Sequence, residues 1–463
     1  MTSPRPQGTL RRTTLARYGL GSLGTGGFAT LPGLVLVYYL TDTLGVAAVA
    51  AGAIVAIAKI WDVLIDPAIG ALSDHDAAQR GSRRRFMTIG ALALPVFFAL
   101  TFAVPTGLAG GPAAVWVTIA FLLAATTFSL FQVPYIALPA ELTDRYDERT
   151  RLLTVRVAVL TVGILAFGAG GPALRELGGS PAVGYLIMAV VSGVVIGAAM
   201  LVASRTADDA RPPETTTHPQ AAGTAVVGEG YRTGLAVLRR SAPLRTLLGA
   251  FVLQGLATGL MLAGAQYIAT WVLDSEAAIS GLFAALIAPA LICAPLWGML
   301  SRRIGKEAGF AAASVLFAVA TLCLIGLWWS PGGWVYLPIG VAGAAYAGMQ
   351  SLPMAMLPDV ITHDERRHGQ STAGVIGGVW TAGETSGMAL GAVVFTVLLA
   401  LGDYISSDAD SAVHQPRSAI VAMVGGFSVV PAALTLVSLL LIARYPLRRS
   451  DIDATPSAEK ETL

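Results

Sequence analysis

The amino-acid sequence predicts an all-α membrane protein with twelve transmembrane helices arranged as two six-helix bundles. Three observations predict this fold class. Hydrophobic residues make up 55% of the 463-residue chain and charged residues only 13%, whereas soluble domains carry roughly 25% charged residues. The apolar residues fall into long segments, each close to the roughly 20 residues that cross a bilayer as a helix. A motif of the second segment also recurs in the second half of the chain.

Six apolar segments in the first half of the chain are each predicted to be a transmembrane helix. Their approximate limits are residues 16–40, 47–72, 86–106, 113–139, 152–174 and 181–203. Six more follow at residues 244–273, 279–300, 307–329, 333–357, 371–400 and 417–443. Strands are excluded because open sheet edges cannot face hydrocarbon. This order predicts an N-terminal bundle over residues 1–203 and a C-terminal bundle over residues 242–443.

The polar connections predict which way the chain lies in the membrane. Residues 204–241 are rich in Pro and Thr and are predicted to be a linker between the bundles, and residues 444–463 form a polar tail. Most of the 30 Lys and Arg residues fall in the termini, the linker and the loops on the same side of the twelve segments. Basic loops stay in the cytoplasm. We therefore expect a multi-pass protein of the cell (plasma or inner) membrane, embedded in the lipid bilayer, with both termini cytoplasmic.

The second apolar segment contains three charged residues. Lys59, Asp62 and Asp66 have the spacing i, i+3 and i+7, which places them on one face of a helix. A charge in the middle of a bilayer costs roughly 2.5–3.5 kcal/mol on insertion scales, so such residues usually mark an ion or substrate pathway. We expect the two carboxylates to bind a cation. The alternative is a buried ion-pair network with Lys59 and Arg156 that only fixes the helices.

An internal repeat favours the functional interpretation. The motif Pro-x-x-Gly-x-Leu-Ser at residues 67–73 recurs at residues 295–301. Two similar bundles in parallel orientation are typical of transporters that expose a central site alternately to each side. In the second copy, the positions that match the two aspartates are Ala290 and Ala294. The carboxylates are therefore not a requirement of the repeated scaffold.

Three motifs together resemble the glycoside–pentoside–hexuronide:cation symporter family of the major facilitator superfamily, to which the melibiose permeases belong. They are Tyr38-Tyr39-x-Thr41-Asp42-x-x-Gly45, Trp61-Asp62-x-x-x-Asp66-Pro67, and the stretch from Pro134 to Pro139. The resemblance covers nearly the whole chain. It implies the major facilitator fold and the symport of a small sugar or glycoside with a coupling cation.

The resemblance implies a cation site in the second helix. In the family, the two aspartates bind the coupling ion together with an Asn or Thr between them and a hydroxyl of the fourth helix. Here the aspartates are Asp62 and Asp66, the hydroxyl falls on Ser129, and the intervening position is Ile65, which offers no oxygen. Hard oxygen donors suit Na⁺ or Li⁺, so a bound Na⁺ is the metal expected. The missing ligand leaves H⁺ open, because a carboxylate in an apolar site can carry a proton itself.

The family's sugar site is matched less completely. Sugar carriers place an acid in the first helix, an acid in the fourth and an aromatic residue one turn later, where this chain has Gly26, Gln132 and Ile136. The basic residue of the fifth helix is kept as Arg156, and a Lys of the eleventh is replaced by Glu384. The resemblance therefore implies Gln132, Arg156 and Glu384 as substrate contacts. Fewer polar groups than in sugar carriers also leave an amphipathic substrate open.

Several other residues allow two interpretations. Tyr135 and Trp380 either line the substrate cavity or pack between helices. Lys59 is expected to be a structural ion-pair partner. Arg156 either contacts substrate or pairs with an aspartate. Glu384 is either a second proton or substrate site or a polar packing residue.

Together these observations predict a cation-coupled secondary transporter of a small organic solute. No nucleophile–base pair or metal cluster is visible, so we expect no enzymatic activity, no cofactor besides the coupling ion, and no nucleic-acid partner. The protein is expected to function as a monomer. Two alternatives remain: efflux or flipping of an amphipathic or lipid-like compound, and a non-transporting membrane receptor.

Overall fold

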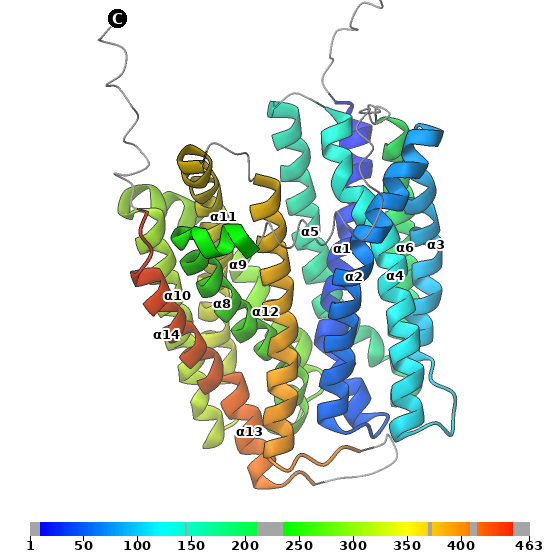
Figure 1. The fold of residues 1–463 in the computed structure, drawn as a ribbon. Helices are drawn as coiled ribbons and strands as arrows, with labels where there is room; N and C mark the ends of the chain where they lie inside the picture. Colours follow the sequence, from blue (N-terminus) through cyan, green and yellow to red (C-terminus); the bar gives the residue numbers. More distant parts are fainter. Residues whose placement is uncertain (1–9, 144–145, 211–234, 369–372, 408–413, 448–463) are drawn as a thin grey trace, which may run out of the picture. The chain divides into compact units, whose positions relative to one another are not determined.

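The computed structural model describes residues 10–143, 146–210, 235–368, 373–407 and 414–447 (Figure 1). The chain divides into two compact units. Unit 1 comprises Met1–Gly223 with Ile405–Val413, and unit 2 comprises Thr224–Tyr404 with His414–Leu463. The described residues are almost entirely helical and contain no strand. The predicted linker lies mostly, and the predicted C-terminal tail almost entirely, outside the described residues.

Unit 1 contains six long helices, one for each predicted segment of the first half. They are α1 (Arg12–Asp42), α2 (Ala48–Arg80), α3 (Arg84–Phe102), α4 (Gly110–Leu142), α5 (Tyr146–Arg175) and α6 (Pro181–Ser204). A short 3₁₀ turn, η1 (Arg205–Asp208), follows. Helix α1 packs against α5 and α6, α3 packs against α4 and α6, and α2 packs against α4.

The helix ends follow from local sequence. At the start of α6 the hydroxyl of Ser180 accepts a hydrogen bond from the backbone N–H of Val183, and Pro181 occupies the first turn, where no N–H is needed. Helix α2 ends at Gly81, which has φ +77°. Glycine adopts this left-handed conformation without the steric cost that a Cβ would add.

Helices α1 and α5 approach each other through glycines. A Cβ added to Gly26 would lie 2.8 Å from the carbonyl oxygen of Leu160, and one added to Gly163 would lie 2.9 Å from the carbonyl oxygen of Leu23. Neither position can therefore hold a larger residue without moving a helix backbone. Small residues at helix contacts are typical of membrane bundles, where close van der Waals packing drives association.

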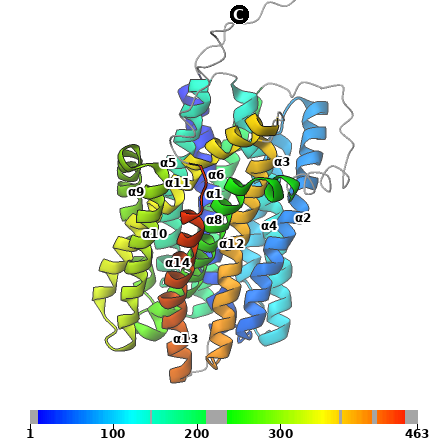
Figure 2. The same ribbon diagram turned by 60° about the vertical axis from the view of Figure 1, so that its left-hand side comes forward.

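Unit 2 repeats this architecture with more interruptions. Its elements are α8 (Ala242–Tyr267), the π-helical turn η2 (Ile268–Val272), α9 (Ala278–Ile304), α10 (Lys306–Cys323), η3 (Leu324–Trp328), η4 (Gly333–Val335), α11 (Tyr336–His368), α12 (Ala373–Leu401), α13 (Arg417–Phe427) and α14 (Val429–Ala443). Helix α8 packs against α12 and α14, and α11 packs against α9 and α10. Figures 1 and 2 both show α8 and α12 side by side.

The last predicted segment, residues 417–443, is two helices. Helix α13 ends at Phe427 and α14 begins at Val429, with Ser428 fully buried between them. The cause is Pro431, because a proline clashes with the carbonyl group four residues earlier and cannot donate a hydrogen bond to it. That carbonyl belongs to Phe427, the last residue of α13. The two helices still form one apolar span, Arg417–Ala443.

Eleven helical spans among the described residues are long and apolar enough to cross a membrane. The predicted segment that is not among these eleven, residues 333–357, forms η4 and the first part of α11. It is less apolar than the others because it contains Gly, Pro, Tyr, Gln and Ser between its aliphatic residues. The all-helical fold of a multi-pass membrane protein is confirmed.

Ion pairs connect helix ends within each unit. In unit 1, Arg83 is 8% exposed and donates a hydrogen bond of 2.7 Å to Glu141 at the end of α4. Burial opposes the charge of this guanidinium, but the bonds to Glu141 and Asp74 outweigh burial and raise the pKa of Arg83. In unit 2, Lys306 pairs with Asp359 at 2.6 Å and Arg240 pairs with Asp364 at 2.7 Å.

Candidate functional site

Lys59, Asp62 and Asp66 of α2 lie together on the face predicted from their spacing. The Lys59 ammonium lies 3.1 Å from Oδ2 of Asp62, and the two side chains are 43% and 22% exposed. Both Asp62 and Lys59 are close enough to Asp66 to act on it electrostatically. One oxygen of each aspartate, Oδ1, is buried without a hydrogen-bond partner. With all three groups ionised, the cluster has a net charge of −1, and it has free acceptor atoms.

Helix α4 brings a hydroxyl to the second aspartate. Ser129 is 3% exposed and lies within hydrogen-bonding reach of Asp66. A second contact fixes how α2 lies against α4: the indole N–H of Trp61 donates a hydrogen bond of 2.9 Å to the hydroxyl of Thr126. The structure thus brings together Asp62, Asp66 and Ser129. Sequence analysis missed Thr126, for which a hydroxyl residue in an apolar helix is the only sequence signal.

The position between the aspartates supplies no ligand. Ile65 is half-buried in α2, one turn after Asp62, and its side chain has no oxygen. The oxygens present in the site are therefore two carboxylates and one hydroxyl. Such a set of hard donors fits a small hard cation or a proton and does not fit a soft metal.

Tyr135 and Arg156 lie in a different part of unit 1. The Tyr135 ring is fully buried, stacks on Tyr18 at 4.5 Å, and donates its hydroxyl proton to the backbone carbonyl of Tyr18 at 2.7 Å. The Arg156 guanidinium lies 5.5 Å from the centre of the Tyr135 ring. Among the ion pairs of the described residues, none joins Arg156 to Asp62 or Asp66. Tyr135 therefore contributes packing and a cation–π contact in this structure.

Two further positions concern the predicted substrate site of unit 1. Gln132 is half-buried in α4, and its Oε1 atom has no hydrogen-bond partner. It can therefore accept a hydrogen bond from a ligand. At Gly26, where sugar carriers have an acid, the backbone of α5 leaves no space for a side chain. The contact between α1 and α5 thus leaves no room for that acid.

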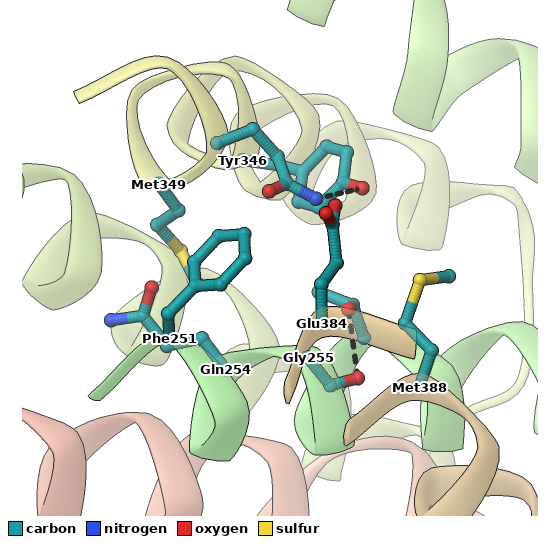
Figure 3. Close-up of a pocket in the computed structure, with 9 residues that line it drawn as sticks. Phe251, Gln254, Gly255, Tyr346, Met349, Glu384 and Met388 are labelled. Atoms are coloured by element: carbon teal, nitrogen blue, oxygen red, sulfur yellow. Dashed lines mark hydrogen bonds between the residues drawn. The ribbon is translucent and has the colours of Figure 1, made fainter. Parts of the chain in front are cut away.

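The predicted residues of unit 2 lie close to each other on α12. Trp380 is 2% exposed and stacks on Phe251 of α8, with the ring centres 4.4 Å apart. Glu384, one turn later, lines a small cavity with Phe251, Tyr346 and Gln350 (Figure 3). Trp380 therefore forms part of the packing behind this cavity, and the Glu384 carboxylate faces it. Sequence analysis missed Tyr346 and Gln350, which a polar side chain in an apolar segment could have indicated.

The family described as "MFS/sugar transport protein" matches residues 17–449. The chain belongs to this family. A glucuronide carrier protein homolog of Escherichia coli (strain K12) is 24% identical over 447 residues, which cover 94% of this chain and 92% of that protein. An inner membrane symporter of the same organism is 22% identical over 436 residues, with 92% and 90% covered. A solved structure of the Escherichia coli xylose transporter superposes with a TM-score of 0.59 at 14% identity, with 95% and 98% covered, and shares the fold.

These similarities confirm the family, the major facilitator fold and the assignment to cation-coupled, sugar-type symport that the sequence predicts. They do not favour efflux or flipping of an amphipathic compound, or a receptor without transport. The relatives are transporters, which is consistent with the expectation of a protein that is not an enzyme. The family description implies a small-molecule substrate. A coupling cation is implied by the names of relatives, among them a putative glycoside/cation symporter of Escherichia coli (strain K12).

Proposed function

We propose that this protein moves a small sugar or glycoside into the cell together with a cation that binds between α2 and α4. The coupling ion is Na⁺ or H⁺, and its ligands are Asp62, Asp66 and Ser129. The relatives named as a glucuronide carrier homolog and a symporter support the substrate class and the mode of transport. The observation that carries the ion site is the pair of buried, unpartnered carboxylate oxygens in α2.

The charge of the site favours a single monovalent cation. Lys59 neutralises one of the two aspartates, so one negative charge remains in an apolar helix. A buried charge without a partner is strongly unfavourable, and a bound cation would remove this penalty. The three donors Asp62, Asp66 and Ser129 are fewer than Na⁺ usually receives. Backbone carbonyl groups or water would complete the shell of Na⁺, whereas H⁺ needs only one carboxylate.

Coupling follows from the same charge. A transporter with an empty ion site must move an uncompensated carboxylate through a region of low dielectric, and ion binding removes that obstacle. If the ion also increases the affinity for substrate, then linkage requires substrate to increase the affinity for the ion by the same factor. Gln132 and Arg156 are the groups of unit 1 that we assign to substrate hydroxyl groups.

The placement in the membrane is part of the proposal. The distribution of Lys and Arg supports cytoplasmic termini, and the exposed apolar side chains of α2, such as Ile60 and Leu64, suit contact with lipid. We propose a functional monomer. Labelling of cysteines introduced at each terminus from either side of the membrane tests the orientation, and size measurements in lipid nanodiscs test the oligomeric state.

Uptake into proteoliposomes tests the proposed transport. Radiolabelled glycosides are offered under an imposed Na⁺ gradient, an imposed H⁺ gradient, or neither. We expect one gradient to drive accumulation in the wild type, and we expect D62N and D66N to lose this response. The matched control is D208N, because Asp208 is exposed and pairs with Arg84 outside the ion site. If neither gradient drives uptake of any glycoside, or if D66N retains the response, the proposal is wrong.

A further inference from the structure

A single carboxylate lies in the apolar interior of unit 2. Glu384 is the only charged residue in α12, and the apolar parts of α8 and α11 that pack nearby contain no Lys or Arg. None of the ion pairs and hydrogen bonds recorded between described residues involves Glu384. An ionisable residue at this depth usually pairs with another charge. Here the neighbouring parts of α8, α11 and α12 offer no cation, so a ligand is the candidate source of the positive charge.

The cavity beside Glu384 has the size of one small polar group. It is lined by α8, α11 and α12, and Figure 3 shows the Glu384 side chain pointing toward Tyr346. The volume of the cavity is about 10 Å³, which is about what one water molecule needs. Phe251, Met349 and Met388 provide apolar walls. A polar group about as large as a water molecule would fill it.

A buried amide offers its oxygen to this cavity. Gln254 is 2% exposed, and its Nε2 donates hydrogen bonds of 2.9 Å to both Ser314 and Ser438. Each serine already donates its own proton to a backbone carbonyl, of Phe310 and Thr435 respectively. With the serine protons placed in this way, both serines accept from Gln254, and its amide nitrogen faces them. The amide oxygen, which has no partner, is left for the cavity.

The cavity is thus rich in acceptors, and its lining carries no positive charge. The carboxylate of Glu384 and the Oε1 atom of Gln254 are acceptors, and the donors among the lining residues are Thr258, Tyr346 and Gln350, all of them uncharged. The Gln350 amide donates a hydrogen bond of 2.6 Å to the Tyr346 hydroxyl. Tyr346 is close enough to Glu384 to act on it electrostatically, and its own proton remains available to the carboxylate. A ligand that brings N–H donors and a positive charge would neutralise Glu384.

We propose that this cavity binds the protonated amino group of an aminated sugar or glycoside, with Glu384 as its acceptor; the inference rests on the proposed sugar transport. An ammonium group is about as large as water, carries three donors and neutralises Glu384. A sugar hydroxyl brings one donor and no charge, and the carboxylate of a hexuronate would be repelled. The face of Phe251 can add a cation–π contact, and the methionines can cover the adjacent carbon atoms. The rest of the sugar lies outside the cavity.

Matched sugars test this inference on the whole protein in lipid nanodiscs. Binding of glucose, glucosamine and N-acetylglucosamine is measured at mildly acidic pH, where glucosamine is protonated and the N-acetyl compound is neutral. Because hydrogen bonds to charged groups are individually strong, we expect glucosamine to bind roughly tenfold to a hundredfold more tightly than the two neutral sugars. We expect E384Q to reduce this ratio to about one. E307Q, a Glu-to-Gln change at the start of α10, should leave the ratio unchanged.

Each outcome has a distinct meaning. If the wild type binds glucosamine no better than N-acetylglucosamine, the inference is wrong, and this comparison needs no variant to fold. A preference that persists in E384Q would overturn it as well. If E384Q loses a dependence on Na⁺ or on pH but keeps the amine preference, the cavity is an ion site and not an amine site. Glucose uptake driven by a gradient without any amine preference would refute this inference and leave the proposed function intact. Amine-selective binding without gradient-driven uptake would refute the proposed function and leave the amine site intact.

Discussion

Replacing Asp66 by Asn removes one negative charge from the α2 cluster and leaves its shape nearly unchanged. The ion pair of Lys59 and Asp62, 3.1 Å apart, remains, so the net charge of the cluster changes from −1 to 0. Two unit charges about 4 Å apart interact by roughly 4 kcal/mol at an effective dielectric constant of about 20. Since about 1.4 kcal/mol is a tenfold change in affinity, the loss of this interaction would lower the cation affinity by up to about three orders of magnitude. The cluster is half-buried and partly screened, so we expect a loss of roughly a hundredfold to a thousandfold in cation affinity.

The assay is a titration of glycoside uptake against Na⁺ and, separately, against external pH in proteoliposomes. D66N should shift the half-saturating concentration of the coupling ion by the factor given above, whereas D208N should not shift it. D62N should be at least as severe, because Lys59 would lose its partner and could then occupy the site by pairing with Asp66. A D66N variant whose half-saturation for both ions stays within about threefold of the wild type would refute the electrostatic reasoning.

Three further substitutions have expected outcomes. G26A should destabilise unit 1 by roughly 1–3 kcal/mol, because its Cβ would overlap the α5 backbone. Its melting temperature should be lower than that of the control G170A, where a Cβ meets nothing within 4 Å. R83M should lower the free energy of unfolding by about 3–5 kcal/mol, because it leaves the nearly buried Glu141 without its partner. The double variant R83M/E141Q should regain much of the lost melting temperature. If it regains none, the pair does not stabilise the fold. I65N adds an oxygen between the aspartates and should lower the half-saturating Na⁺ concentration for uptake relative to the wild type, whereas an unchanged value would place the ion elsewhere.

Much of the fold could be predicted because its causes are local. The length and apolar character of each segment determine whether it spans a bilayer, and these are visible in the sequence. The two departures of the structure from the predicted segments have local causes too. Pro431 divides the last span after Phe427, and the start of α11, which contains Gly and Pro, is less apolar than the other spans. In the same way, Asp62 and Asp66 could be recognised from the free energy that a charged residue costs in an apolar helix.

The partners of these residues could not be predicted from local sequence. That Ser129 reaches Asp66 depends on how α4 lies against α2, and only a family resemblance suggested it. Gln254 and Tyr346 lie far from Glu384 in the sequence and approach it only because α8, α11 and α12 meet. Whether an amide in an apolar segment faces a cavity or a neighbouring helix depends on such packing. The hydrogen bonds of Gln254 decide the matter here, and they are visible only in three dimensions.

The contact at Gly26 restricts how substrate preference can change during evolution. An acid at this position would collide with the backbone carbonyl of Leu160, and a backbone atom cannot be trimmed by substitution. A side chain at this position requires the two helices to separate, and the packing that they lose opposes this change. Variation on α4 and α12 does not meet this contact. Positions such as Gln132 and Glu384 are therefore the accessible sites for acquiring a new substrate.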